Sequence, residues 1–171
     1  MLTNNFNAMM AIILQRCSTS KGLLPITAYN GTQYWINPGT NLSGVTMTLT
    51  TSANGTGICV GTGNTAAAAT DYQLESPITS GLTASVTQMV GLDGSGNPYL
   101  TFDVTITNTG SASVTIKEIG YRQILSGATE NGGSSASSRV CLLDRTVLDE
   151  PVTIAAGGIG TIRYTLKTVI V

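Results

Sequence analysis

The sequence contains no histidine and very few charged side chains. Of its 171 residues only 10 % are charged, with eight Lys or Arg against nine Asp or Glu and a formal net charge of −1. Without histidine, the chain lacks the usual general base of hydrolytic triads and the commonest zinc ligand. No basic run is present to attract nucleic acid. We therefore expect a protein that is not an enzyme and has no catalytic residues, no metal site and no cofactor.

Cysteines and long apolar runs are also scarce. Cys17, Cys59 and Cys141 are odd in number and far apart, and the last two lie in apolar runs. We expect them to be small buried hydrophobes in a protein assembled in a reducing compartment, with one disulfide left open as an alternative. The apolar run at residues 8–14 is too short to span a bilayer and has no preceding Lys or Arg. Neither a signal peptide nor a membrane partner is expected.

Strict alternation of apolar and polar residues is the strongest feature present. Between residues 99 and 107 apolar side chains alternate with Thr and Asp, and residues 45–50 and 161–167 repeat the pattern. Alternation with period two is typical of a strand with one buried and one wet face. The apolar set of the first and third segments is predicted to form a shared core: Leu100, Phe102, Val104, Ile106, Ile162, Tyr164 and Leu166.

Turn signals divide the rest of the chain into further short strands. The Asn30-Gly31 pair predicts a hairpin, and a parity slip at Lys117 and Glu118 predicts a β-bulge. Residues 126–138 are rich in Gly and Ser and are expected to form a loop. Eight to ten strands at this spacing favour an all-β fold, an antiparallel β-sandwich of jelly-roll or immunoglobulin-like topology, with a short N-terminal α-helix.

The expected helix carries an apolar stripe at helical spacing. Its members are Phe6, Met9, Met10, Ile13 and Leu14. We divide the chain into residues 1–22, the amphipathic helix and a polar linker, and residues 23–171, the β-sandwich domain. The stripe is predicted to dock on a neighbouring subunit. The alternative is that it folds back onto its own core.

Three short motifs suggest chemistry and are given simpler interpretations. The segment GTGNTA at residues 61–66 matches a dinucleotide fingerprint but leaves no room for the required helix, so it is interpreted as a loop. Residues 93–97 resemble half a calcium loop and are interpreted as a hairpin turn, with an adventitious cation site as the alternative. Arg145, beside several carboxylates at residues 144–150, is expected to form a structural ion pair rather than part of a glycosidase site.

Several segments resemble recurrent parts of small virion proteins of tailed bacteriophages. They are VGTGNTAAAATDYQLESPI at residues 60–78, VTITNTGSASVTIKEIG at 104–120, LLDRTVLDEPVTIAAG at 142–157 and the opening LTNNF at 2–6. Such segments occur in uncharacterised structural proteins of gut and marine phages. The resemblance implies a capsid, neck or tail component, and the family supplies no catalytic residues.

Composition and resemblance together predict a non-enzymatic structural component of a tailed-phage particle. It would be a capsid decoration, neck or collar, or tail protein that acts through packing between subunits. We expect it in the virion, assembled in the host bacterial cytoplasm, as a homo-oligomer bound to other virion proteins, without direct contact to nucleic acid or membrane. The alternative is a receptor- or glycan-binding virion module, whose aromatic supply would be Tyr29, Tyr34, Trp35 and Tyr72.

Overall fold

The computed structural model describes residues 1–6, 24–43, 48–52, 55–129 and 136–167. These residues form eight β-strands. In chain order they are β1 (Leu24–Thr27), β2 (Gln33–Ser43), β3 (Gly57–Gly61), β4 (Leu82–Leu92), β5 (Pro98–Asn108), β6 (Val114–Thr129), β7 (Ala136–Ile154) and β8 (Ile159–Lys167).

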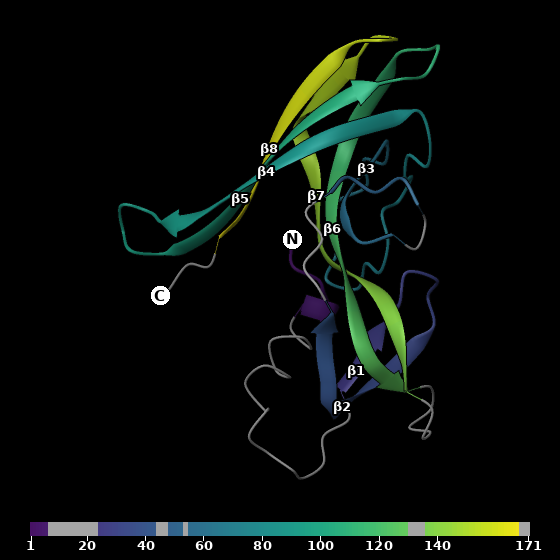
Figure 1. Ribbon diagram of the computed structural model, residues 1–171, viewed down its shortest axis with the longest axis vertical. Helices are drawn as coiled ribbons and strands as arrows, with labels where there is room; N and C mark the ends of the chain where they lie inside the picture. The colour runs from purple at the N-terminus through teal and green to yellow at the C-terminus, as the bar shows by residue number, and fades with distance from the viewer. Residues whose placement is uncertain (7–23, 44–47, 53–54, 130–135, 168–171) are drawn as a thin grey trace.

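The strands form two sheets, and every pairing between named strands is antiparallel. In the first sheet the long strand β6 pairs with β7 on one side and with both β2 and β3 on the other, while β1 extends the sheet beyond β2. The second sheet has the order β4-β5-β8 and crosses one end of the β6–β7 ribbon (Figure 1). The prediction of an all-β antiparallel fold is confirmed.

The alternating segments occupy the second sheet and supply much of the core. Phe102, Val104 and Ile106 of β5 are fully buried, and they pack in one cluster with residues of β3 and β6 from the other sheet. The ring of Phe102 stacks on Tyr121 and Tyr164, with centroids 5.5 and 6.1 Å apart. The predicted core is therefore confirmed at its centre.

Two members of the predicted core are only half-buried. Leu100 and Leu166 pack against the edge of the cluster rather than inside it. Both lie near the end of the second sheet, where β4 and β5 extend beyond the core (Figure 1). The same alternation thus continues past the point at which the other sheet stops covering it.

The β-bulge predicted at Lys117 and Glu118 is confirmed as an irregularity of the β6–β7 ladder. Ile116 pairs with Val152, but Glu118 pairs with Val147, so the extra residues lie on β7. Glu118 has the same parity along β6 as the buried Ile116, and it is completely buried as well. At the irregularity, β6 therefore carries a carboxylate on a buried face.

Two sequence-based expectations differ from the structure. Residues 126–138 were expected to be a loop, but β6 continues to Thr129 and β7 begins at Ala136, with the two paired there. For the strand expected at residues 45–50, residues 45–47 lie outside the described part, and Leu49 makes only an isolated parallel bridge to Ile58. Because β6 and β7 pair along their length, both strands extend into this segment despite its Gly and Ser residues, which form strands poorly.

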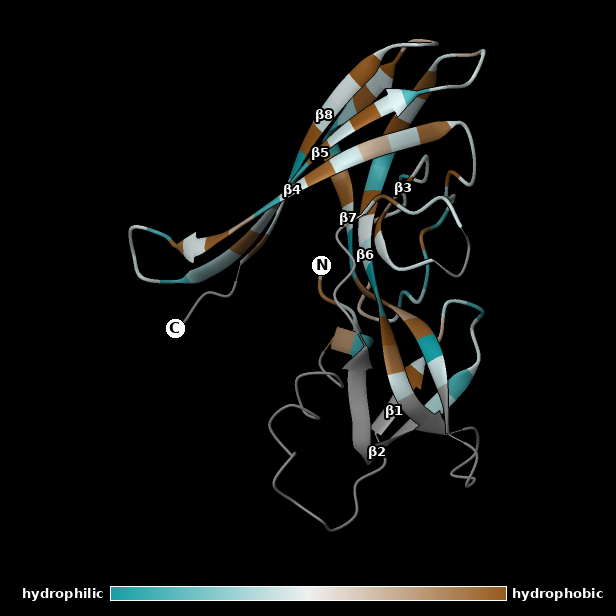
Figure 2. Ribbon diagram, in the orientation of Figure 1, coloured by the Kyte–Doolittle hydropathy of each residue, from teal (hydrophilic) through white to brown (hydrophobic). Residues whose placement is uncertain are grey.

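The outer part of the β4–β5 hairpin, residues 88–100, is here called the arm. It projects away from the body of the molecule, and hydrophobic positions alternate along it up to the polar turn at its tip (Figures 1 and 2). Of the described residues, none belongs to a helix long and apolar enough to cross a membrane.

Candidate functional site

The first six residues lie along the outer edge of β7. The backbone N–H of Thr3 donates to Leu143 O at 3.0 Å, and its hydroxyl donates to Leu142 O at 2.7 Å. The side chain of Asn5 exchanges hydrogen bonds of 2.7 and 2.8 Å with the backbone of Thr27. The start of the chain therefore joins β1 to β7 and covers their edges.

This arrangement bears on the predicted docking stripe. Phe6 packs against the protein's own core cluster, in a short helical turn at residues 4–6. Met9, Met10, Ile13 and Leu14 lie outside the described residues. Contact with a neighbouring subunit stays a prediction for those four side chains.

A buried guanidinium organises the interior next to the long loop that follows β3. Arg145 is only 3 % exposed. Its Nε donates to Glu118 at 2.8 Å, its Nη1 to Asp71 at 2.9 Å, and its Nη2 to the carbonyl oxygen of Thr65 at 3.0 Å. Nη2 also lies 3.4 Å from a carboxylate oxygen of Glu75. Burial lowers the pKa of Arg145, but the hydrogen bonds and negative charges of Glu118 and Asp71 outweigh this effect and raise the pKa overall.

Glu118 is the second centre of this network. Its Oε1 accepts the backbone N–H groups of Gly63 and Ser76 at 3.1 and 2.8 Å. Its Oε2 accepts the N–H of Glu75 at 3.0 Å besides the bond from Arg145. A buried charge is tolerated when it is paired and hydrogen-bonded in this way. We call Glu118, Arg145, Asp71 and Glu75 the ion cluster.

The ion cluster explains the Gly-Thr-Gly motif at residues 61–63. A Cβ added at Gly63 would lie 2.7 Å from Oε1 of Glu118, and one at Gly61 would lie even closer to it. The glycines thus let the loop backbone approach a carboxylate of the protein itself. The loop interpretation of residues 61–66 is confirmed, since no helix follows them in residues 62–81.

The structural role expected for Arg145 is correct, but its predicted partners are wrong. The sequence suggested a carboxylate within residues 144–150, whereas the partners come from residues 71, 75 and 118. Closeness in sequence does not identify the partner here, because consecutive strand residues such as Asp144 and Arg145 point to opposite faces of the sheet. The signal that was available is Glu118 itself, a charged residue between the apolar residues Ile116 and Ile119 at a parity slip.

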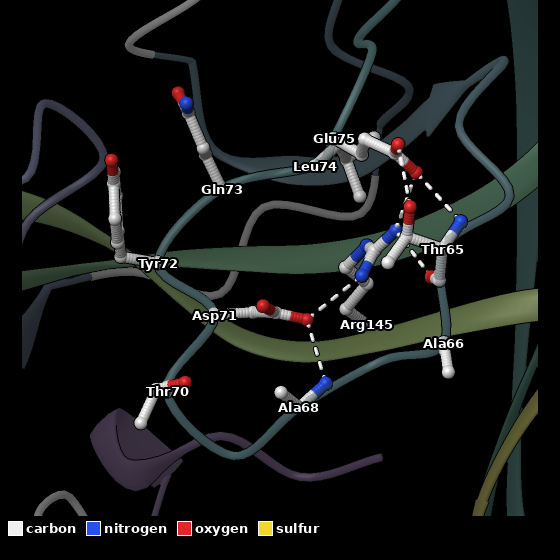
Figure 3. A pocket seen from close by; sticks show the side chains of 10 residues that line it. All are labelled: Thr65, Ala66, Ala68, Thr70, Asp71, Tyr72, Gln73, Leu74, Glu75 and Arg145. Carbon is white, nitrogen blue, oxygen red and sulfur yellow. Dashed lines mark hydrogen bonds and ion pairs between the residues drawn. The ribbon is translucent and has the colours of Figure 1, made fainter.

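Beside the ion cluster the loop borders an open pocket of about 420 Å³, lined by both polar and apolar atoms. Figure 3 shows Asp71 and Glu75 turned toward Arg145, while the ring of Tyr72 stands at the rim. Hydrogen bonds from Thr65, first its hydroxyl and then its backbone N–H, lower the pKa of Glu75. The polar atoms of the cluster mostly bond to one another and to the loop backbone. These side chains therefore hold the loop against the sheet.

The turn at the tip of the arm has the geometry of a hairpin. Oδ1 of Asp93 accepts the N–H groups of Ser95 and Asn97 at 2.8 and 2.9 Å, and Gly96 has φ of 80°. An aspartate bonded to its own turn and a glycine with positive φ are what this turn requires. Across the described part of the chain, no group of three or more His, Cys, Asp or Glu side chains could hold a metal ion.

The arm is the most apolar exposed part of the described surface. Met89, Val90 and Leu92 are 51, 67 and 68 % exposed. On its inner side the arm borders an open, mainly apolar groove of about 390 Å³. The groove is lined by Leu2, Phe6, Val90, Gly91, Pro98, Tyr99, Leu100 and Leu166. Exposed apolar side chains that gather around a groove are typical of a surface that binds another protein.

Comparisons with known proteins add no relative: the family models, the curated proteins and the solved structures each contain no match to this chain.

Proposed function

We propose that this chain is a non-enzymatic structural subunit of a tailed-bacteriophage particle, as a capsid decoration, neck or collar, or tail protein. Its partners would be copies of itself and other virion proteins, with no direct contact to nucleic acid or membrane. The protein would reside in the virion after assembly in the host bacterial cytoplasm. The four resembling segments support the assignment to a phage particle.

The observation that carries the structural role is the arm. A hairpin that exposes Met89, Val90 and Leu92 beside an apolar groove leaves a large hydrophobic area in water unless a partner covers it. The low charge of the chain, at 10 %, adds little repulsion between copies. Both features favour a protein that works by packing against neighbours.

The test is the composition of the particle. Purified particles of the virus that encodes the chain should contain it in stoichiometric amounts by mass spectrometry, and gold labelling of a tagged copy should place it at one position in electron micrographs. Abundant protein in infected cells that is absent from particles would refute the proposal. A fixed position on the head, neck or tail would also decide among the three placements.

The docking stripe can be tested separately in the same particles. The variant Met9→Asp/Ile13→Asp should fold normally but fail to incorporate, because it places charge on the apolar stripe. A matched variant, Asn7→Asp/Gln15→Glu, adds the same charge outside the stripe and should incorporate. If the first variant unfolds instead, the stripe belongs to the protein's own core.

A second candidate is a glycan-binding virion module. The pocket beside the ion cluster supports it, because Tyr72 lines this pocket together with the carboxylates of Asp71 and Glu75 (Figure 3). Aromatic faces next to polar groups are common in ligand sites. Binding of purified protein to host cells that is lost in Tyr72→Ala and retained in Tyr99→Ala would favour this function.

A further inference from the structure

We propose that β4 is a self-pairing edge, through which two copies of this chain join their second sheets into one continuous sheet. The inference rests on the proposed function for its biological setting only. The observations that carry it are the length, the composition and the hydrogen-bonding phase of this strand.

Within the described residues, β5 is the only strand that pairs with β4, so one edge of β4 faces outward along its whole length. All eleven residues pair with β5 without a register shift. An exposed edge is normally protected by charge, proline, a bulge or a covering segment. β4 has no Lys, Arg, Asp, Glu or Pro, and no bulge.

The other edges in the described structure carry such protection. β8 contains Arg163, and the side chain of Asn5 bonds to the backbone of Thr27 in β1. β3 is bridged by Leu49 and Pro77. The first residues of the chain cover residues 142–145 of β7, and a later part of that strand contains Asp149, Glu150 and Pro151. β4 therefore stands out as the edge left open to another strand.

Two hydrogen bonds define which backbone groups of β4 point outward. At one end of the hairpin the N–H of Asp93 donates to Asn97 O, and at the other the N–H of Thr109 donates to Gly81 O. Hydrogen-bonded pairs alternate along an antiparallel ladder, so odd-numbered residues of β4 bond to β5. The outward groups belong to Leu82, Ala84, Val86, Gln88, Val90 and Leu92.

This phase makes β4 complementary to a second copy of itself. An antiparallel pair that uses all eleven residues places Thr87 on the twofold axis opposite its own copy. Each outward-pointing residue then meets another one, giving about twelve hydrogen bonds between the two copies. A twofold interface of this kind closes on itself and leaves no open edge for further growth.

The side chains fit the same register. Val90 would lie opposite Ala84, and Leu92 opposite Leu82, on the face that packs against the core. Ala84 and Leu82 already contact their own core cluster. The exposed arm of each copy would thus extend the core of the other, which removes its apolar side chains from water.

The register can be tested by cross-linking in the full chain carrying Cys17→Ser. Thr87→Cys should form a disulfide-linked dimer under mild oxidation, since opposite residues of a non-hydrogen-bonded pair have Cα atoms about 4.5 Å apart. Ser85→Cys alone should not cross-link, because Ser85 faces Met89 of the other copy. The double variant Ser85→Cys/Met89→Cys should. Cross-linking of Ser85→Cys with none for Thr87→Cys would overturn the register.

The dimer itself can be measured by sedimentation equilibrium on the purified protein. Val90→Lys should raise the dissociation constant at least about tenfold, because it places a charge among apolar side chains. Ile159→Lys is a matched control on β8, with an exposed fraction of 69 % against 67 % for Val90, and should leave the constant unchanged. Gln88→Pro, which removes one outward N–H and no bond to β5, should also weaken the dimer.

A wild-type protein that is monomeric, or equal dissociation constants for Val90→Lys and Ile159→Lys, would overturn the inference. These outcomes are independent of the proposed function. A dimer by this edge can exist in a protein that is absent from particles, and particle incorporation can occur without the dimer.

Discussion

Replacing Glu118 by glutamine changes the interior of the protein at almost constant volume. Oε1 of Glu118 accepts two backbone N–H groups, and Oε2 accepts a third together with Nε of Arg145. An amide nitrogen on either side would face two donors, so two hydrogen bonds are lost whichever way the amide turns. The buried guanidinium would also lose its closest carboxylate.

The expected cost follows from these contacts. Each hydrogen bond to a charged group contributes about 1.5–3 kcal/mol, and removing one partner of a buried ion pair costs about 3–5 kcal/mol. We therefore expect Glu118→Gln to lower the free energy of unfolding by about 3–5 kcal/mol. For a chain of this length that corresponds to a melting temperature lower by about 6–20 °C.

Urea unfolding followed by far-ultraviolet circular dichroism measures this change directly. Asp103→Asn is the matched control, because it makes the same carboxylate-to-amide change in an exposed pair, bonded to Arg163 at 2.6 and 2.9 Å. Exposed ion pairs contribute little to stability, so the control should unfold close to wild type. If Glu118→Gln were as stable as Asp103→Asn, the ion cluster would not be what fastens the loop.

Three further predictions follow from burial and charge. Phe102→Ala should lower the free energy of unfolding by about 3–5 kcal/mol in the same assay, as expected for a fully buried ring. Burial raises the pKa of Cys59 to about 11 and that of Cys141 to about 12. Both thiols should therefore resist a thiol reagent until the protein is denatured. The free energy of unfolding should also fall as pH rises above about 9, where the thiols of the unfolded chain ionise. Hydrogen bonds lower the pKa of Glu75 and Asp103 in the folded state. The two carboxylates therefore stabilise the fold above their ordinary pKa values of 4.5 and 3.8, and this stabilisation should be lost as pH falls below them. A Glu75→Gln/Asp103→Asn variant whose melting temperature falls as steeply in acid as that of wild type would contradict this.

The second sheet could be predicted from sequence because its signal is local. Leu100, Phe102, Val104 and Ile106 lie on one face whatever the rest of the chain does, since the alternation of side chains is a property of the strand itself. How far the core covers that face is not local. It depends on where the other sheet ends, so the arm has the same alternating pattern as the buried part of the hairpin.

The ion cluster could not be predicted because its members meet only after the strands have paired. Arg145 pairs with Gly120, so it is a diagonal neighbour of Glu118 across the β6–β7 ladder, and this register exists only because of the shift after Ile116. Asp71 reaches the same guanidinium through a loop whose course the backbone of Gly63 and Ser76 defines. A parity slip indicates that a bulge exists, but it does not say which strand carries the extra residues or which side chains then meet across the ladder.

The ion cluster lies within the segments that resemble virion proteins, whereas the arm lies outside them. The segments at residues 60–78, 104–120 and 142–157 converge on the ion cluster: the first supplies its loop carboxylates, the second Glu118 and the third Arg145. Under the proposed function, the segments that resemble virion proteins are therefore the ones that fasten a loop to a sheet in this chain. The arm lies outside all three segments. We therefore propose that choice of partner depends on the arm, while the ion cluster stabilises the framework from which the arm projects.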